Sequence, residues 1–313
     1  MERTIGNFSV SAAILTYSDR GEILISVIDG LLKYKLNKIY IFCNEVPALT
    51  LEHLRDRFSE GHVIFIQSKN NLGSAGGYFE LLKYISLNDE SDYILLLDDD
   101  NKLQHCDSFD FIDDSDTIYY INRPSRKAVV STIESGNAAK ILGPKAGFLG
   151  RSIFPSHYEE PCIGTDLMAA PYGGMMLPKK VLTLGVFPDK DYFLYADDYA
   201  YSYSLVADYG FKIKFVESAQ IVDLEDSFHL ESKRNLFRNR YMSANRVQLY
   251  YSVRNQIYFI LSTSTNKLLF YINLIVFYPV FLFQFLLTGN FPKARLFTSA
   301  VCDGLLMYFR SRK

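Results

Sequence analysis

The apolar segment Tyr93–Leu97, followed directly by Asp98, Asp99 and Asp100, constrains the fold more than any other part of the chain. Five consecutive apolar residues are too few for a helix and predict a strand buried on both faces, as in a parallel sheet. In open α/β folds, ligands bind at the carboxyl end of such strands. Adjacent carboxylates repel one another and need a counter-ion, and Mg²⁺ or Mn²⁺ binds one or two carboxylates together with substrate phosphate. The segment therefore predicts a metal and phosphate site, with a solvated acidic turn as the alternative.

Strands and helices alternate before this segment. Apolar runs predict strands at Ser9–Tyr17, Lys38–Cys43 and His62–Gln67, and the segments between them predict helices at Glu22–Tyr34, Thr50–Glu60 and Gly73–Leu87. Such alternation predicts successive βαβ units, and hence a parallel sheet with right-handed crossovers. We therefore expect the loops after all four strands to lie along one edge of the sheet, which is the predicted active site.

A glycine-rich loop opens the third of these helices. Asn71 is followed by Gly73, Gly76 and Gly77, and glycine lets a backbone approach a ligand closely. Free amides at a helix N-terminus favour phosphate, although the spacing is neither the dinucleotide pattern nor a Walker loop. The alternative is a tight helix start in which small residues serve packing.

A second acidic pair follows an aromatic run later in the chain. Asp197 and Asp198 precede a helix predicted at Tyr199–Tyr209, which Gly210 ends. The pair could act chemically or could only cap the helix. Phe211–Val216 then predicts a short edge strand.

Three further segments separate the two acidic groups. Lys127–Ile133 has strand character, residues 135–165 are expected to form a long substrate-side loop, and Ala169–Pro178 is expected to be a loop that enters a strand. Its paired glycines, Gly173 and Gly174, would allow a ligand or another backbone to come close.

The composition argues against several classes of protein. A formal charge of −2 over 313 residues gives no reason to expect nucleic acid as a partner. The four cysteines, Cys43, Cys106, Cys162 and Cys302, form no CxxC pair, so we expect reduced thiols and no structural zinc site. The segment Met1–Asn7 is polar overall and the next apolar run predicts a strand, so no secretory signal is expected.

Taken together, these motifs resemble the family 2 glycosyltransferases with a GT-A fold, in particular the bacterial galactofuranosyltransferase and rhamnosyltransferase branch. Asn71–Gly77 is similar to the donor loop of that branch, Asp98–Asp100 to its DxD metal motif, Phe193–Asp198 to the segment with its catalytic base, and Tyr250–Asn255 (YYSVRN) to its YYxxRN segment. The resemblance extends over about residues 8 to 260.

The resemblance implies an α/β, Rossmann-like GT-A fold with a mixed sheet flanked by helices. It places a catalytic domain at residues 1–230, with the nucleotide-sugar half at about 1–105 and the acceptor half at 106–230. Apart from the resemblance, we expect residues 231–313 to be a helical, membrane-associating region.

The implied activity is inverting, metal-dependent transfer of a sugar, with galactofuranose or rhamnose favoured. The donor would be UDP-galactofuranose or dTDP-rhamnose, the metal Mg²⁺ or Mn²⁺, and the acceptor a polyprenyl-linked glycan in bacterial cell-surface polysaccharide biosynthesis. Two other hypotheses remain: a catalytically inactive scaffold, and a nucleotidyltransferase, which the lack of a basic phosphate loop disfavours. The sequence leaves open whether the protein forms a homo-oligomer.

The resemblance also assigns roles to residues. Asp198 would be the general base, and Asp197 would position the acceptor or orient Asp198, or the two roles would be exchanged. Donor-binding residues would be Thr16, Asn44, Asn71, Gly73, Gly76, Gly77, Asp98 and Asp99, and acceptor-binding residues Tyr172, Gly173 and Gly174. The metal would be held by Asp98, Asp100 and Asp223, with His229 as the alternative third ligand. The chain departs from the family pattern at Ala200, where Glu is usual, and at Asp223, near the place of a His.

The C-terminal third predicts attachment to a membrane. Ser232–Leu261 has the pattern of a long basic helix, and the uncharged run Leu268–Thr288 is long enough to span a bilayer. Both flanks are basic and Pro279 interrupts the run, so a single span would export one basic flank against the positive-inside tendency. We expect a cytoplasmic protein held peripherally on the inner face of the cell membrane. A true span, or a helix pair packed on protein, is the alternative.

Overall fold

The computed structural model describes residues 8–59, 61–106, 108–125, 146–154, 167–225 and 239–312. These residues fall into two compact units. The sheet unit takes those within Met1–Leu142, Cys162–Phe193 and Asp197–Glu225, and the helical unit takes those within Gly143–Pro161, Leu194–Ala196 and Asp226–Lys313. The predicted strand Lys127–Ile133, most of the predicted loop 135–165 and His229 lie outside the described residues.

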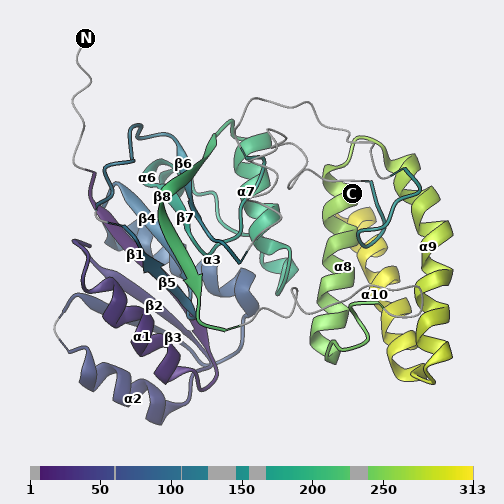
Figure 1. Ribbon diagram of the computed structural model, residues 1–313, viewed down its shortest axis with the longest axis horizontal. Coiled ribbons are helices and arrows are strands. Elements are labelled where there is room, and N and C mark those ends of the chain that lie inside the picture. The colour runs from purple at the N-terminus through teal and green to yellow at the C-terminus, as the bar shows by residue number, and fades with distance from the viewer. Residues whose placement is uncertain are drawn as a thin grey trace. The chain divides into compact units, whose positions relative to one another are not determined.

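The sheet unit is built on a mixed sheet with the strand order β3-β2-β1-β4-β7-β6-β8-β5 (Figure 1). Its strands are β1 (Val10–Tyr17), β2 (Ile39–Asn44), β3 (Val63–Ser68), β4 (Tyr93–Asp98), β5 (Asn101–Gln104), β6 (Ile118–Asn122), β7 (Met175–Pro178) and β8 (Ile213–Asp223). The first four strands pair in parallel, as the alternation predicts. Their carboxyl ends, including Asp98 at the end of β4, therefore share one edge.

Helices cover both faces of this sheet. The helices of the sheet unit are α1 (Gly21–Leu31), α2 (Ala48–Arg57), α3 (Gly73–Asn88), α6 (Lys179–Thr183) and α7 (Asp197–Ala207), with a 3₁₀ turn, η1, at Lys190–Tyr192. Along β4, Leu95 and Leu97 pack in one core with α1 and α2, whereas Ile94 and Leu96 pack in another with α3, α6 and α7. Alternate side chains of a strand point to opposite faces, so an uninterrupted apolar run is what a strand between two helical layers requires.

Two predictions for the region around the second acidic pair are wrong in detail. Strand β8 runs to Asp223 and lies between β6 and β5, so it is not a short edge strand. Its apolar first part pairs with β6, whereas its last part, beyond the exposed polar residues Glu217 and Ser218, pairs with β5. Helix α7 begins at Asp197 rather than at Tyr199, which puts both carboxylates in its first turn.

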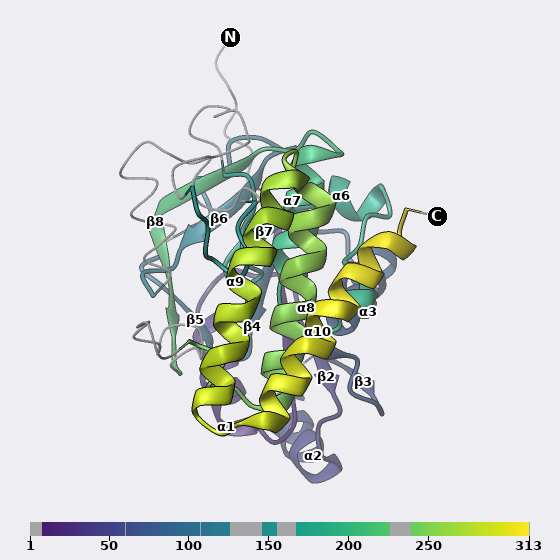
Figure 2. The same cartoon turned by 90° about the vertical axis from the view of Figure 1, so that its right-hand side faces the viewer.

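The helical unit contains α8 (Arg246–Thr263), α9 (Lys267–Leu287) and α10 (Phe291–Arg310), which lie side by side (Figure 2). The prediction of a helix from Ser232 is wrong over residues 239–245, which are not helical, while residues 232–238 lie outside the described residues. The helix begins at Arg246 because Asn245 and Gln248 form a capping box. Its core is rich in aromatic rings, with Phe297 of α10 stacked on Tyr278 and Phe281 of α9.

Candidate active site

The turn that follows β4 separates the three aspartates. Asp99 is buried, and one of its oxygens accepts hydrogen bonds from Thr16 Oγ1 at 2.8 Å and from Arg20 Nε at 2.9 Å. Arg20 also pairs with Glu225 at 2.8 Å. Burial keeps the pKa of Asp99 above its ordinary value, although the Arg20 and Thr16 hydrogen bonds lower it. The predicted donor-binding residues Thr16 and Asp99 therefore hold each other and fix the turn.

Asp98 and Asp100 share their surroundings with Asp223 at the end of β8. Arg123, a buried residue just after β6, lies with Nη1 3.5 Å from Asp98 Oδ2 and Nη2 2.6 Å from Asp223 Oδ1. Asn101 Nδ2 donates to Asp100 Oδ1 and to Asp223 Oδ1, each at 2.9 Å. Burial raises the pKa of Asp100 to about 7, and the charges of Asp98, Asp99 and Asp223 add to this effect. The cluster thus carries more negative charge than its arginine offsets.

This excess charge suits a divalent cation held by two of the carboxylates. Both oxygens of Asp223 already accept hydrogen bonds, Oδ1 from Arg123 and Asn101 and Oδ2 from Ser125. Within the described parts of the chain, no group of three or more His, Cys, Asp or Glu is arranged to hold a metal. Asp98, whose side chain is 42% exposed, and Asp100 fit Mg²⁺ or Mn²⁺, which completes its shell with water and substrate oxygens.

Asn44 at the end of β2 fixes the glycine-rich loop. Its Oδ1 accepts from Leu72 N at 2.8 Å and its Nδ2 donates to Gly73 O at 3.1 Å. Asn71 adds a bond, since its Oδ1 accepts from Gly73 N at 2.9 Å. The predicted donor-binding residues Asn44 and Asn71 thus shape the loop, and they use two of its backbone amides to do so.

The glycines of this loop are packed against the chain's own atoms. Gly73 has a φ of +68°, and a Cβ there would lie 1.9 Å from Phe193 O. A Cβ on Gly76 would lie 2.8 Å from Leu72 Cβ, and one on Gly77 would lie 2.5 Å from Leu15 Cδ1. The structure therefore gives the three glycines the packing role that was the alternative interpretation, and contact with a donor stays a prediction.

The glycine loop and the second acidic pair meet directly. Ser74 Oγ donates to Asp197 Oδ2 at 2.7 Å, and Asp197 is buried while Asp198 is partly exposed. Burial raises the pKa of Asp197 well above its ordinary value, and the neighbouring charge of Asp198 raises it further. One carboxyl of the pair is thus held inside the protein and the other is accessible.

The buried Tyr78 of α3 shows that the two acidic groups converge. Burial raises the pKa of its hydroxyl well above the ordinary value, and the charges of Asp98, Asp99 and Asp197 all add to the rise. The Tyr78 hydroxyl donates to Leu97 O at 2.7 Å, directly before the first acidic group. Carboxylates that are about 100 positions apart in the chain therefore act on one tyrosine at the carboxyl edge of the sheet.

The predicted acceptor-binding residues are buried next to the side chains that hold the acidic cluster. Tyr172 is buried, with its ring centroid 4.0 Å from that of Tyr78. A Cβ on Gly173 would lie 2.0 Å from Asn101 Oδ1 and 2.4 Å from Arg123 Nη1, so this glycine makes room for both side chains. Gly174 is also buried. The structure places Tyr172, Gly173 and Gly174 as supports of the acidic cluster, and their contact with an acceptor stays a prediction.

Sequence reasoning missed several polar residues that hold the site together. In the sheet unit they are Arg20, Ser74, Asn101 and Arg123. In the helical unit, the hydrogen bonds of Asn255 to the backbone before Asp197 were also missed. Ser74 lies inside the donor-loop motif Asn71–Gly77, whereas Arg20, Asn101 and Arg123 stand in none of the motifs. Asn255 stands in one, since it ends the YYSVRN segment.

Asn255 fixes the backbone that leads into Asp197. It is fully buried and donates to Leu194 O at 2.7 Å and to Tyr195 O at 2.9 Å. Tyr195 and Ala196 have φ of +68° and +62°, a conformation that costs non-glycine residues about 1–2 kcal/mol each. Such strain persists only where neighbouring groups impose it, and it gathers at functional sites. Asn255 is therefore a positioning residue for the acidic pair.

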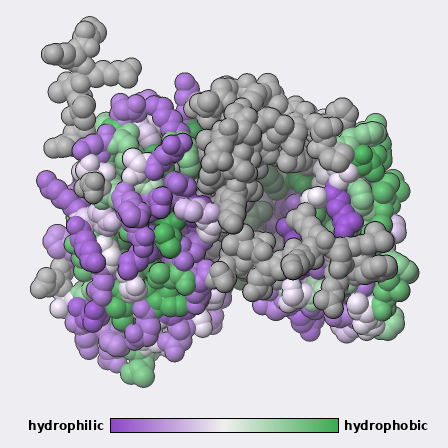
Figure 3. Space-filling model, viewed as in Figure 1, coloured by the Kyte–Doolittle hydropathy of each residue, from purple (hydrophilic) through white to green (hydrophobic). Residues whose placement is uncertain are grey.

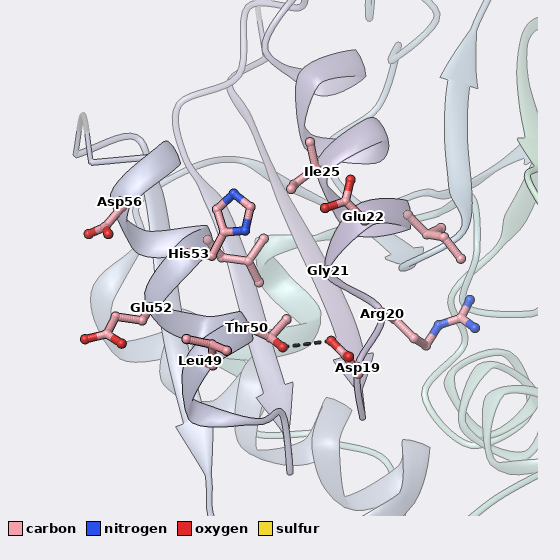
Figure 4. A pocket seen from close by; sticks show the side chains of 12 residues that line it. Asp19, Arg20, Gly21, Glu22, Ile25, Leu49, Thr50, Glu52, His53 and Asp56 are labelled. Atoms are coloured by element: carbon pink, nitrogen blue, oxygen red, sulfur yellow. Dashed lines mark hydrogen bonds between the residues drawn. The ribbon is translucent and has the colours of Figure 1, made fainter.

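A separate cavity of about 640 Å³ lies between the starts of α1 and α2 (Figure 4). Its lining includes four carboxylates, from Asp19, Glu22, Glu52 and Asp56, against Arg20 and His53. Figure 4 shows the Arg20 side chain pointing away from α2, and its guanidinium pairs with Asp99. This acidic lining opposes the binding of a diphosphate, so the cavity is a poor candidate for the donor site.

The raised pKa of Asp197 predicts how stability depends on pH. The folded carboxyl retains its proton where the unfolded one has lost it, so its contribution to the free energy of unfolding is complete below the ordinary pKa of 3.8. That contribution declines as the pH rises towards the raised folded pKa. The test is urea unfolding of the wild type and Asp197→Asn at about pH 5 and about pH 8. The difference in free energy of unfolding, wild type minus variant, should be smaller at pH 8 than at pH 5. The exposed change Asp191→Asn should show no such trend, and a flat difference for Asp197→Asn would contradict the burial argument.

Neither a protein-family model nor a curated protein matches the sequence. Solved structures match its fold. GalNAc-T7 with UDP, GalNAc and Mn²⁺ aligns with a TM-score of 0.52 and 12% identity over 82% of this chain and 50% of that one, so this chain spans half the length of that neighbour. Staphylococcus aureus TarS with UDP-GlcNAc aligns with a TM-score of 0.51 and 14% identity over 96% and 81% of the two chains. The mannosyltransferase PcManGT from Pyrobaculum calidifontis, with GDP-Man and Mn²⁺, aligns with a TM-score of 0.52 and 8% identity over 98% and 89%. The chain therefore has the GT-A fold of these structures.

Proposed function

We propose that the protein is a metal-dependent glycosyltransferase that moves a sugar from a nucleotide diphosphate donor to an acceptor hydroxyl. One observation carries the proposal: α3 joins the two acidic groups at the carboxyl edge of the sheet, since its Ser74 donates to Asp197 and its Tyr78 donates to Leu97 O, directly before Asp98. Support also comes from the structural neighbours, which were solved with UDP, UDP-GlcNAc or GDP-Man and, in two of them, Mn²⁺.

Asp98 and Asp100 would hold Mg²⁺ or Mn²⁺. When bound, the metal would neutralise the charge that develops on the departing diphosphate. Arg123 keeps Asp98 and Asp223 in place, and Asn101 does the same for Asp100. The buried arginine and amide would thus preorganise the two carboxylates for the metal.

Asp198 would accept the proton of the acceptor hydroxyl as that oxygen attacks the anomeric carbon. It is the partly exposed member of the pair, as a base that meets substrate must be. Asp197, buried and bonded to Ser74, would orient the first turn of α7. A single displacement with Asp198 on the face opposite the leaving group inverts the anomeric configuration.

The resemblance to the galactofuranosyltransferase and rhamnosyltransferase branch suggests UDP-galactofuranose or dTDP-rhamnose as donor, and we propose a polyprenyl-linked glycan as acceptor. The test is to incubate the purified chain and Mn²⁺ with a panel of nucleotide sugars and to measure release of each nucleoside diphosphate by chromatography. We expect one of these two donors to be consumed faster than the others. If no donor is turned over or bound, the proposed activity is wrong.

Replacing Asp100 should weaken the metal site. In Asp100→Asn the cluster keeps its shape but loses one charge, so the Mn²⁺ concentration for half-maximal binding should rise about 10-fold or more. Electron paramagnetic resonance of free Mn²⁺ measures this without any turnover. Asp110→Asn, an exposed change in the loop beyond β5, is the matched control. Equal affinities of wild type and Asp100→Asn would exclude Asp100 as a ligand.

Replacing Asn255 tests the positioning role. Asn255→Ala leaves two carbonyls without their donor and relaxes the strained backbone, so kcat should fall about 10- to 100-fold while the donor KM changes little. Asn266→Ala is the matched control in the same unit, because Asn266 caps α9 by accepting from Leu269 N at 2.9 Å, and it should leave kcat within about 2-fold of the wild type. Equal effects of the two substitutions on kcat would mean that Asn255 acts only through stability.

A further inference from the structure

We propose that the exposed face of α9 docks flat on an anionic lipid bilayer, such as the cytoplasmic face of a cell membrane, without crossing it. This inference rests on the helical unit alone and does not depend on the proposed activity. It is argued from the apolar surface of α9, from the way its other face is held, and from the charge of the unit.

The exposed side of α9 is a continuous apolar stripe. The large exposed side chains recur at helical spacing: Leu268, Ile272, Ile275, Val276, Phe283, Leu286 and Leu287. Three of them, Leu268, Ile275 and Phe283, are 71%, 72% and 58% exposed. No charged residue follows Lys267 within the helix. In Figure 3 the right-hand margin, where Figure 1 draws α9, is hydrophobic. Contiguous apolar surface of this kind marks a site of protein or membrane contact.

The opposite side of α9 is bound into the helical unit by two buried polar side chains. Asn273 donates to Ala146 O at 2.8 Å and accepts from Ile153 N at 2.9 Å. Gln284 accepts from Asn239 Nδ2 at 2.9 Å. A span through a bilayer would have to release these bonds and expose both amides to hydrocarbon, which costs several kcal/mol for each unsatisfied group. The helix is long and apolar enough to cross a membrane, but its inner face favours docking by one side only.

The charge of the helical unit selects lipid over a second copy of the chain. Its described residues include nine Lys or Arg and one Asp, whereas the whole chain has a formal charge of −2. Each Lys or Arg near an anionic surface adds about 1 kcal/mol to binding, and long basic side chains reach headgroups while their stems stay in the apolar layer. Two copies of so basic a unit would repel one another. An apolar stripe on a unit of net positive charge therefore fits a bilayer with anionic headgroups.

Vesicle flotation of the full chain tests this docking. We expect binding to vesicles that contain phosphatidylglycerol, at least 10-fold weaker binding to pure phosphatidylcholine, and weaker binding in high salt. The double variant Ile275→Asp, Phe283→Asp should lose at least 10-fold in binding. The matched control, Leu49→Asp, Leu87→Asp, changes two exposed leucines of the sheet unit and should float like the wild type. Circular dichroism with heating verifies that both variants are folded.

Three results would overturn the proposal. In the first, the folded α9 variant binds vesicles as well as the wild type. In the second, the wild type does not bind vesicles but sediments as an oligomer that the α9 variant dissociates, which would assign the stripe to a second copy. In the third, vesicle-bound protein resists extraction with alkaline carbonate, which would mean that α9 crosses the bilayer. Donor binding by the α9 variant should equal that of the wild type, so failure of docking and failure of the proposed activity are separable.

Discussion

Asp198→Asn is expected to lower turnover about 10²- to 10⁴-fold while donor affinity stays within about 2-fold of the wild type. The amide keeps the size of the side chain and its place in the first turn of α7, but it cannot accept the acceptor's proton. The measurement is the single-turnover transfer rate with saturating donor, together with donor affinity by calorimetry.

Asp191→Asn provides the control for this change. It makes the same chemical substitution at an exposed position of η1, close in sequence but outside the acidic pair, and should leave the rate unchanged. Turnover of Asp198→Asn within about 10-fold of the wild type would remove Asp198 as the base. A chain with no turnover in either form, whose role in the cell survives the substitution, would be the scaffold of the competing hypothesis.

Gly73→Ala is expected to destabilise the protein by about 2–5 kcal/mol, a large part of the total stability of an ordinary domain. Two costs combine. A left-handed φ of +68° is unfavourable for alanine, and its Cβ would have to displace Phe193 O, which lies 1.9 Å from the ideal position. Ala75 N also donates to Phe193 O at 3.1 Å, so the clash would break this hydrogen bond. The glycine loop would then lose its contact with the backbone that precedes the acidic pair.

Gly185→Ala separates the two costs. Gly185 has a φ of +71°, but a Cβ there would have no atom within 4 Å, so only the backbone cost of about 1–2 kcal/mol remains. Urea unfolding of both variants measures the difference. Equal losses of stability would contradict the packing role of Gly73.

The first half of the fold could be predicted from sequence because its signals are local. Strands β1 to β4 are apolar runs, and alternation with helices determines that they pair in parallel. Strand β5, with the sequence NKLQ, has no such signal and is a strand because β8 pairs with it. The second half of β8 was missed for a related reason: Glu217 and Ser218 interrupt its apolar pattern, and the pairing that continues the strand is not local.

The positions of the candidate site residues could be predicted, whereas their partners could not. Topology brings the ends of parallel strands to one edge, so acidic residues after β4 could be placed there without coordinates. The bonds from Arg20 to Asp99, from Arg123 to Asp223 and from Asn255 to Leu194 join residues 79, 100 and 61 positions apart. Their existence depends on side-chain directions in the folded chain, which spacing in one sequence does not encode.

The central claim is that a metal-bound nucleoside diphosphate lies between Asp98, Asp100 and the acidic pair of α7. An anomalous difference map from crystals grown with Mn²⁺ and UDP or dTDP tests it most directly. We predict a Mn²⁺ peak within coordination distance of Asp98 and Asp100, bridging to the diphosphate, with Asp198 open to the same space. Nucleotide in the cavity between α1 and α2, or a Mn²⁺ peak that touches neither Asp98 nor Asp100, would contradict the claim.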